Sequence, residues 1–433
     1  MSISKKKLLI YAVFAIGILL YLLCGSFAAS SPERLLRPDS DGYLLPARAL
    51  AEGAGYPTTT RPPGYPLLAA AVYFCGGTNV ILAFIGIFAA LGACAITGLA
   101  AGEYAGKTCG ITAALLALFN LTVIANAPLL LSDSWFFLFA ALQLWLFVLF
   151  YRRNDCRFAL GCAAVAAFGT LIRPINQLFI LPLIVLIFIH PALPSRKKFI
   201  TAGMALLIFM ALILPWMYRN YRCGATFAID TNTGAMRHQN GAMLMAEVNG
   251  TDFESEKSRL LAVEQKLTFP DARSHENWRI NEFRQMVLAH PFIYFKQHFN
   301  WQILLPDAPT FLENLGATSA NRGTMGVLKR DGVFAACRHY FGANWWCYLL
   351  VLLPLLLITM LLYAAALVRL AMDIKNYRRY WREVILFLAF CEYYFFLPGA
   401  ITAPRYQLPA LPFLCTIAAC LITSYVEKTP ADN

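Results

Sequence analysis

Residue types suited to acid–base and anion chemistry are concentrated in one polar stretch, Arg37 to Leu68, which follows the first apolar segment. Asp39 and Asp41 are two residues apart, Tyr43 follows them, and Arg61 precedes a double proline. A carboxylate can take up a proton, and an arginine can pair with a phosphate or a carboxylate. Because ionisable groups beside a bilayer are costly to desolvate, we interpret this stretch, called loop one below, as the place where chemistry occurs.

The composition is that of a protein with many membrane spans. Hydrophobic residues make up 59% of the chain and charged residues 14%, with a mean hydropathy of +0.57, whereas soluble domains carry roughly 25% charged residues. The net charge is +12, but the basic residues form short clusters between apolar runs, which is typical of topology signals rather than of nucleic-acid binding. No CxxC pair or Cys/His cluster has metal spacing, which argues against a zinc site.

The apolar runs predict an all-α polytopic bundle of about ten spans. The run after Lys5 to Lys7 resembles a signal peptide, but it is about long enough to cross a bilayer, which takes roughly 20 residues, so we retain it as the first span. A break at Arg173-Pro174 separates two short spans, because proline is a poor interior residue for a helix in lipid. The spans are expected at about 8–29, 79–101, 110–127, 134–151, 158–172, 175–190, 199–218, 347–369, 384–400 and 407–426.

Lysine and arginine counts orient these spans with the N-terminus inside. The inner segments then hold 16 basic residues and the short outer segments 6, in agreement with the excess of positive charge found on inner loops. The unusual polar residues at span boundaries all fall on the outer side; they are Asp39, Asp41, Arg61, Asp133, Arg173, Arg219 and Arg405. Loops far apart in sequence can therefore converge on one site for a phosphate-bearing lipid and a general base.

Each of these residues also has a plain structural alternative. The loop-one acids, or Asp133, could cap the helices that follow them. Arg61 could lie among lipid headgroups, as arginines at span ends commonly do. Arg173 and Arg405 each adjoin a proline and could simply neutralise an acid. The prediction of a site therefore depends on the shared side and the combination of residue types.

Several motifs together resemble the GT-C superfold glycosyltransferases, of the polyprenyl-phosphate-sugar-dependent kind that includes aminoarabinose transferases and protein O-mannosyltransferases. The matching stretches are PDSDGY and GAGYPTTTRPPGYPLL in loop one, then PLLLSDSWFF, TLIRPINQLFILP, ILPWMYRNYRCG and APRYQLPALPFL, in the family's order over nearly the whole chain. The resemblance implies a GT-C transmembrane helix bundle. It also implies transfer of a single hexose or pentose, with inversion, from a polyprenyl-phosphate-sugar donor to a lipid, glycan or protein acceptor.

The resemblance implies roles for individual residues as well. Family members place a catalytic aspartate four residues before a tyrosine, as Asp39 stands before Tyr43, so Asp39 is the expected general base. Asp41 forms a DxD-like pair with it. The basic residue before the double proline, Arg61, and the late Arg405 are expected to face the donor phosphate.

Further roles complete the predicted site. Arg173 is assigned to the donor phosphate, and a possible Mg²⁺ or Mn²⁺ would be held by Asp39, Asp41 and Asp133. Substrate-binding or helper roles are expected for Tyr43, Tyr65, Asp133, Arg219 and Tyr406. Pro46 departs from the family's pattern and leaves the start of its helix, and so the orientation of the two acids, open.

Residues 221–345 are too polar for the membrane and are about a small domain in length. We expect a mostly helical outer domain that caps the site and helps recognise the acceptor, between an N-terminal core, 1–220, and the last spans, 346–433. Cys223 and Cys337 would both face an oxidising compartment and could pair. The predicted protein is a multi-pass protein of the bacterial inner membrane whose site faces the periplasm.

Two other functions stay open on the sequence alone. A ligase or polymerase of lipid-linked saccharides would also be polytopic, but its required acid would lie in the outer domain. A transporter or flippase would place ionisable residues or two repeated halves within the spans, whereas here the charges lie at boundaries. The expected partners are membrane lipid, a lipid-linked sugar and its acceptor, and no nucleic acid.

Overall fold

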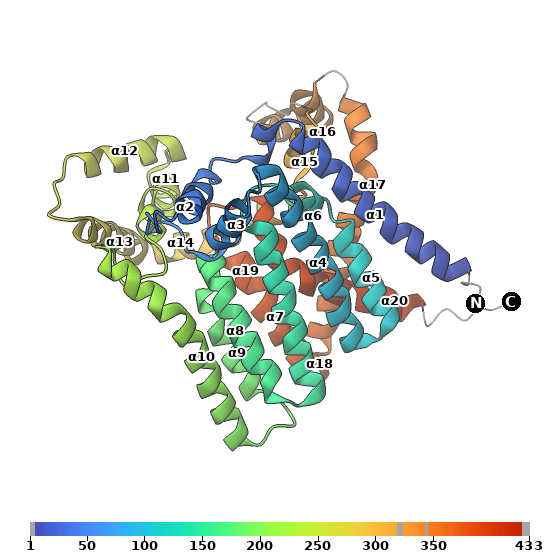
Figure 1. Cartoon of the computed structure of the whole chain (residues 1–433). Coiled ribbons are helices and arrows are strands. Elements are labelled where there is room, and N and C mark those ends of the chain that lie inside the picture. The colour runs from blue at the N-terminus through green and yellow to red at the C-terminus, as the bar shows by residue number, and fades with distance from the viewer. Residues whose placement is uncertain (1–4, 318–323, 343–344, 427–433) are drawn as a thin grey trace.

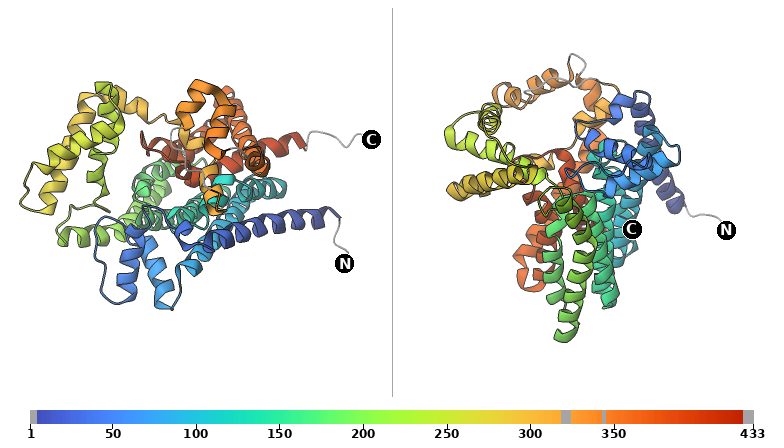
Figure 2. Two further views of the ribbon diagram at one scale, coloured as in Figure 1. Left: turned by 90° about the horizontal axis from the view of Figure 1, so that it is seen from above. Right: turned by 60° about the vertical axis from the view of Figure 1, so that its left-hand side comes forward.

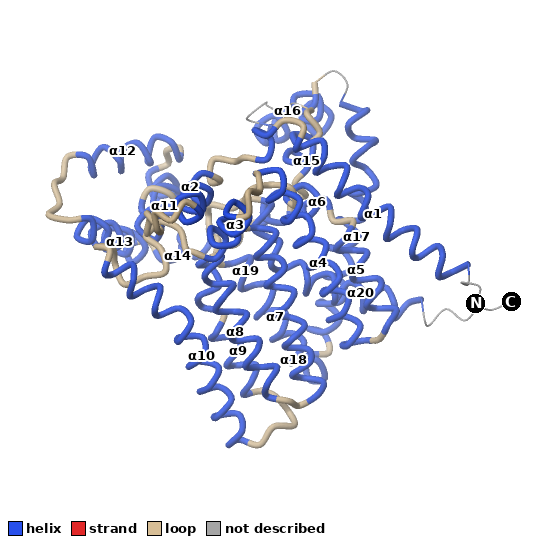
Figure 3. The backbone as a smooth tube through the Cα atoms, viewed as in Figure 1, coloured by secondary structure: helices blue, strands red, loops and turns tan. Residues whose placement is uncertain are grey.

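The computed structural model describes residues 5–317, 324–342 and 345–426, and this part of the chain consists of helices joined by loops and turns, without strands (Figures 1 and 3). The all-α fold class expected from the apolar periodicity is confirmed. Most helices run side by side in one bundle, and a group of polar helices stands beyond one of its ends (Figures 1 and 2).

Six helical segments in the described ranges are long and apolar enough to cross a membrane. They are α1 (Lys5–Ala29), α4 (Asn79–Ala105), α7 (Asp133–Arg153), α10 (Ser195–Arg222), α17 (Trp345–Lys375), and η6 (Pro404–Ala410) with α20 (Leu411–Val426). Each coincides with a predicted span, and the chain is a multi-pass membrane protein.

The other four predicted spans coincide with shorter apolar helices. These are α5 (Lys107–Leu118) with α6 (Leu121–Asn126), α8 (Cys156–Ile172), η2 (Pro174–Leu178) with α9 (Ile180–Phe188), and α18 (Tyr377–Phe387) through η5 (Leu388–Glu392) to α19 (Tyr393–Phe396). The predicted break at Arg173 is present, because α8 ends at Ile172 and η2 begins at Pro174. A count of ten spans stays a prediction.

Small residues set the closest helix contacts in the bundle. A Cβ placed on Gly110 of α5 would lie 2.6 Å from the carbonyl oxygen of Gly98 in α4, so these two helices touch backbone to backbone. Along α8, the residues that face its neighbours are also small, with Ala163 and Ala167 fully buried. This is the usual way in which helices associate in lipid, where van der Waals packing replaces the hydrophobic effect.

Between α1 and α4, loop one and the residues that flank it fold into three short helices across one end of the bundle: η1 (Pro32–Leu35), α2 (Asp41–Ala51) and α3 (Gly64–Phe74). The first residue of α2 is Asp41. Pro46 lies in its second turn without ending the helix. Backbone contacts also tie this region to the bundle, since the Leu130 N–H donates to the Leu35 carbonyl at 2.9 Å.

The polar segment 221–345, called the polar domain below, contains two groups of helices. The first comprises η3 (Asn232–Arg237), α11 (Asn240–Asn249), α12 (Phe253–Gln265), α13 (Ala272–Ala289) and α14 (Pro291–Gln297), beyond the end of α10 (Figure 1). The second comprises η4 (Trp301–Leu304), α15 (Ala308–Asn314) and α16 (Thr324–Phe341). Cys223 and Cys337 are free thiols, so the pairing considered for them is not formed. The proposed domain boundaries stay predictions.

A buried ion cluster holds the first group together. Glu264 of α12 accepts hydrogen bonds from Arg237 Nη1 at 3.2 Å and from Arg279 Nε at 2.7 Å, and His275 Nε2 lies 2.9 Å from the same carboxylate. Arg237 is fully buried and also lies 4.4 Å from the ring centre of Trp278. A buried carboxylate requires such pairing, because an uncompensated charge there costs several kcal/mol.

Candidate active site

Asp39 lies at the centre of the candidate site, between two arginines from opposite ends of the chain. Its Oδ1 accepts from Arg61 Nη2 at 2.9 Å and its Oδ2 from Arg405 Nη2 at 2.7 Å. Arg61 also lies 4.7 Å from the ring centre of Tyr43. Four residues selected from sequence, Asp39, Tyr43, Arg61 and Arg405, are therefore in direct contact.

Local backbone structure places this group. A turn positions Asp39, because the Ser40 N–H donates to the Arg37 carbonyl at 2.8 Å and the Ser40 side chain accepts from the Arg37 N–H at 2.9 Å. Arg61 crosses α2 at Gly42, where an added Cβ would lie 3.1 Å from Arg61 Nε. The absence of a side chain at position 42 thus lets the guanidinium reach Asp39 along the helix surface.

A second ion pair lies beside the first. Asp133, the first residue of α7, pairs with Arg173 at the junction of α8 and η2. The ring of Tyr406 joins the two pairs, because its centre lies 5.2 Å from the guanidinium of Arg173 and 5.6 Å from that of Arg405. Four segments distant in sequence therefore meet at one end of the bundle, as the boundary charges had predicted.

Tyr43 connects the pairs on the other side, and Tyr65 packs against it. The Tyr43 hydroxyl accepts from Ser132, the neighbour of Asp133, at 3.3 Å. Tyr65 of α3 is buried with its ring centre 5.4 Å from that of Tyr43, in an edge-to-face arrangement. Tyr65 therefore supports Tyr43 from within the fold.

Arg219 acts on the backbone of loop one rather than on another charge. Its guanidinium donates to the carbonyls of Thr58, at 2.8 Å, and of Tyr56. The Tyr56 hydroxyl in turn donates to the Arg61 carbonyl at 2.9 Å. Arg219 is thus a positioning residue that fixes the segment carrying Arg61, a role that the sequence left undefined.

The electrostatics of the site favour an anion. Burial tends to raise the pKa of Asp39, but the guanidinium groups of Arg61 and Arg405 outweigh it and hold this pKa below its usual value. Three arginines face two aspartates in the two linked pairs, so these pairs alone, without the nearby Asp230, have an excess of one positive charge. A phosphodiester group would balance this charge.

The carboxylates do not assemble as a cation site. Asp39 and Asp133 are each paired with arginine, whereas Asp41 is exposed and its side chain has no hydrogen-bond or ion-pair partner among the described residues. Among the described residues, no three His, Cys, Asp or Glu side chains are grouped so as to hold a metal ion. The arrangement of these three aspartates does not fit a shared cation, and metal binding by them stays a prediction.

Asp230 is a further acid near the site that carried no signal in the sequence. It is 7% exposed, and the next residue, Thr231, donates from its N–H to the Thr59 carbonyl of loop one at 3.0 Å. Burial raises the pKa of Asp230 to about 6, with Glu276 adding to the effect and Arg61 opposing it. The position of Asp230 depends on this contact between loop one and the polar domain, and no local sequence motif predicts that contact.

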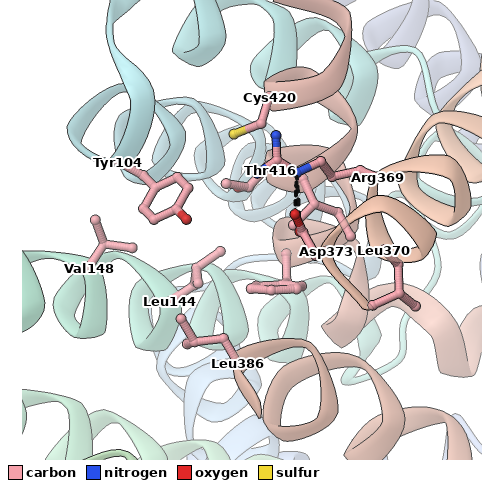
Figure 4. Close-up of a pocket in the computed structure, with 11 residues that line it drawn as sticks. Tyr104, Leu144, Val148, Arg369, Leu370, Asp373, Leu386, Thr416 and Cys420 are labelled. Atoms are coloured by element: carbon pink, nitrogen blue, oxygen red, sulfur yellow. Dashed lines mark hydrogen bonds and ion pairs between the residues drawn. The ribbon is translucent and has the colours of Figure 1, made fainter. Parts of the chain in front are cut away.

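A separate pocket lies at the other end of the bundle (Figure 4). It is lined by Tyr104 near the end of α4, Cys420 of α20, and Arg369 and Asp373 near the end of α17. Arg369 Nε lies 3.1 Å from the carboxylate of Asp373. The two charges of this pocket neutralise each other and are remote from loop one, so the pocket is not part of the candidate site.

Comparison with known proteins supports the GT-C fold expected from the sequence. Residues 60–218, less than half of the chain, match the family described as dolichyl-phosphate-mannose-protein mannosyltransferase. The match includes Arg61, Asp133 and Arg173 but begins after Asp39. No curated protein matches the chain significantly.

A solved structure matches the whole chain. It is the archaeal oligosaccharyltransferase AglB from Archaeoglobus fulgidus, in complex with an inhibitory peptide and a dolichol-phosphate, with 14% identity and a TM-score of 0.50. The match covers 100% of this chain and 53% of that one, so the chain spans about half the length of this relative. Both matches are to glycosyltransferases of the GT-C fold, and the GT-C architecture expected from the sequence is confirmed.

Proposed function

We propose that this chain, which has the fold of the GT-C glycosyltransferases, is a membrane glycosyltransferase that moves a single sugar from a polyprenyl-phosphate donor to a lipid, glycan or protein acceptor. The site would face the outer side of the membrane, and the inner membrane of a bacterium is the proposed location. The observation that carries the proposal is the pairing of Asp39 with Arg61 and Arg405, beside the Asp133–Arg173 pair.

The charge of the site favours a donor with a single phosphate. The phosphodiester of a polyprenyl-phosphate sugar carries one negative charge, which matches the excess positive charge of the two ion pairs. After transfer, the released polyprenyl phosphate carries about −1.5 to −2 at neutral pH. Arg61 and Arg405 would stabilise the charge that develops on this leaving group, which is where electrostatic catalysis has its largest effect.

Asp39 is the proposed proton acceptor. It would take the proton of the acceptor hydroxyl as that oxygen bonds to the anomeric carbon, while the bond from this carbon to the phosphate oxygen breaks and its electron pair leaves with the phosphate. One such displacement inverts the anomeric configuration. In the structure both oxygens of Asp39 are occupied by arginines, so we expect the donor phosphate to draw Arg61 and Arg405 away first.

The proposal is tested by transfer from a set of polyprenyl-phosphate sugars to membrane acceptors, with the protein in nanodiscs. Asp39→Asn should abolish transfer while the protein stays folded and inserted. Asp252→Asn is a matched control, because Asp252 is an exposed cap of α12 in the polar domain and asparagine caps about as well. If no donor is consumed, or if Asp39→Asn transfers at the rate of the unchanged protein, the proposal fails.

A further inference from the structure

The end of α13 and the following helix α14 expose a strip of large apolar side chains. Leu288 is 67% exposed, Phe292 86%, Phe295 55% and Phe299 52%. Leu288 lies in the last turn of α13, Phe292 and Phe295 lie in α14, and Phe299 follows its end, so the four come from one short stretch of chain. We call these four residues the α14 patch. Exposed apolar groups at such density mark a binding surface rather than ordinary protein surface.

The α14 patch contacts the end of a predicted span. The ring centres of Phe295 and Phe299 lie 5.4 and 5.7 Å from that of Phe396, the last residue of α19. Phe396 also lines a groove between α9 and α18–α19, together with Pro182, Val185, Ile385 and Leu388. The patch therefore continues an apolar surface that begins within the predicted spans.

The position of α14 agrees with the height of a membrane surface. In Figure 1, it lies level with the end of α10 nearest the polar domain. That end of α10 exposes Tyr218 and Tyr221, which are 54% and 43% exposed. Tyrosines in this situation are typical of the boundary between lipid and water.

The charges near the patch are already compensated. Lys296, the basic residue of α14, lies 3.0 Å from Glu247 of α11, and Gln297 Nε2 donates to the same carboxylate at 2.8 Å. An acidic or basic protein partner would find little to pair with here. Lipid acyl chains require only apolar surface and a place at the right depth.

We propose that the α14 patch is a membrane-docking surface, on which the polar domain rests in the lipid leaflet at the loop-one end of the bundle. The occupant is bilayer lipid, and the groove beneath Phe396 takes part of an acyl chain. The inference requires membrane insertion but not the proposed chemistry. Its consequence is that the polar domain is held at a fixed height above the site.

Spin-label accessibility tests the proposal in the full chain, in nanodiscs of phosphatidylcholine. The exposed thiols Cys75 and Cys223 are first changed to serine, and a nitroxide is attached at Phe292→Cys or, as a control, at Val263→Cys. Val263 is 42% exposed on α12, in the same domain. A label on so exposed a position as 292 should leave the fold unchanged, which equal thermal midpoints would verify.

The label at position 292 should be accessible to oxygen and several-fold less accessible to a water-soluble nickel reagent, whereas the label at position 263 should show the reverse. Equal access of the nickel reagent to both positions would overturn the proposal. Shielding of position 292 from both reagents, with broadening from a second nitroxide, would instead assign the patch to a second copy of the chain and would also overturn it. The label at position 292 should stay exposed to lipid when Asp39→Asn is also introduced. This result would show that membrane docking does not depend on the proposed transfer.

Discussion

Replacement of Asp39 by asparagine should have opposite effects on donor binding and on transfer. In the structure the carboxylate holds Arg61 and Arg405 at 2.9 and 2.7 Å. A donor phosphate that recruits both arginines must break these two ion pairs. Removal of the negative charge eliminates that competition, while it also removes the proposed proton acceptor.

The size of the binding effect follows from the exposure of the pair. The Asp39 side chain is 43% exposed, so solvent screening limits each ion pair to about 1 kcal/mol. Two pairs give about 2 kcal/mol, which corresponds to roughly 30-fold tighter binding of a phosphate lipid. Loss of a general base lowers transfer by about 10² to 10⁴. The variant should therefore bind its donor better and use it far less.

The assay uses undecaprenyl phosphate as the probe, titrated into nanodiscs that hold the unchanged protein, Asp39→Asn or the control Asp252→Asn. Transfer is measured in parallel under single-turnover conditions. Binding at least tenfold weaker in Asp39→Asn, with the fold intact, would refute the competition and show that Asp39 is needed to orient the arginines. Unchanged transfer would refute the role as base.

Three further changes address the supports of the site. Gly42→Ala should lower the transfer rate about tenfold or more, because the new methyl group displaces Arg61 and small misplacements of a reacting group are costly. It should not destabilise α2. The transfer rate and the thermal midpoints of the variant and the unchanged protein test both expectations. Asp230→Asn should stabilise the protein by roughly 3 kcal/mol at pH 7.5 but hardly at pH 4. The fold raises the pKa of Asp230 to about 6, so ionisation of this carboxyl group destabilises the fold as the pH rises from the ordinary pKa of an aspartate through 6. Equal changes in the free energy of unfolding at both pH values would contradict the burial of a charge. Glu264→Gln should cost about 3–5 kcal/mol of unfolding free energy in the polar domain, because buried Arg237 loses its counter-ion; denaturant unfolding of the polar domain measures it, and a loss below 1 kcal/mol would contradict it.

The types and convergence of the site residues could be predicted because membrane topology restricts where charge is tolerated. Arg61 and Arg405 are far apart in sequence, but the predicted topology puts both at span boundaries on the same side, which allows them to meet. The structure adds that both contact one carboxylate. That detail depends on the turn at Ser40, where hydrogen bonds to Arg37 fix the direction of Asp39.

Other features of the site were beyond the reach of the sequence. The DxD spacing placed Asp39 and Asp41 together, but α2 begins between them, so one lies in a turn under two arginines and the other is exposed on the helix. Arg219 holds backbone carbonyls, which have no side-chain signature. Asp230 is near the site only because Thr231 bonds to loop one. Each is set by tertiary contacts that local patterns do not encode.

The pairing of Asp39 with Arg405 joins residues 366 positions apart. A chain emerging from the ribosome inserts loop one early, whereas Arg405 arrives only with the last span, η6 and α20. Until then Asp39 has Arg61 alone, and Tyr406 is missing from between the two ion pairs. Completion of the proposed phosphate site is thus delayed to the end of synthesis, so a truncated or half-inserted chain should not carry out the proposed transfer.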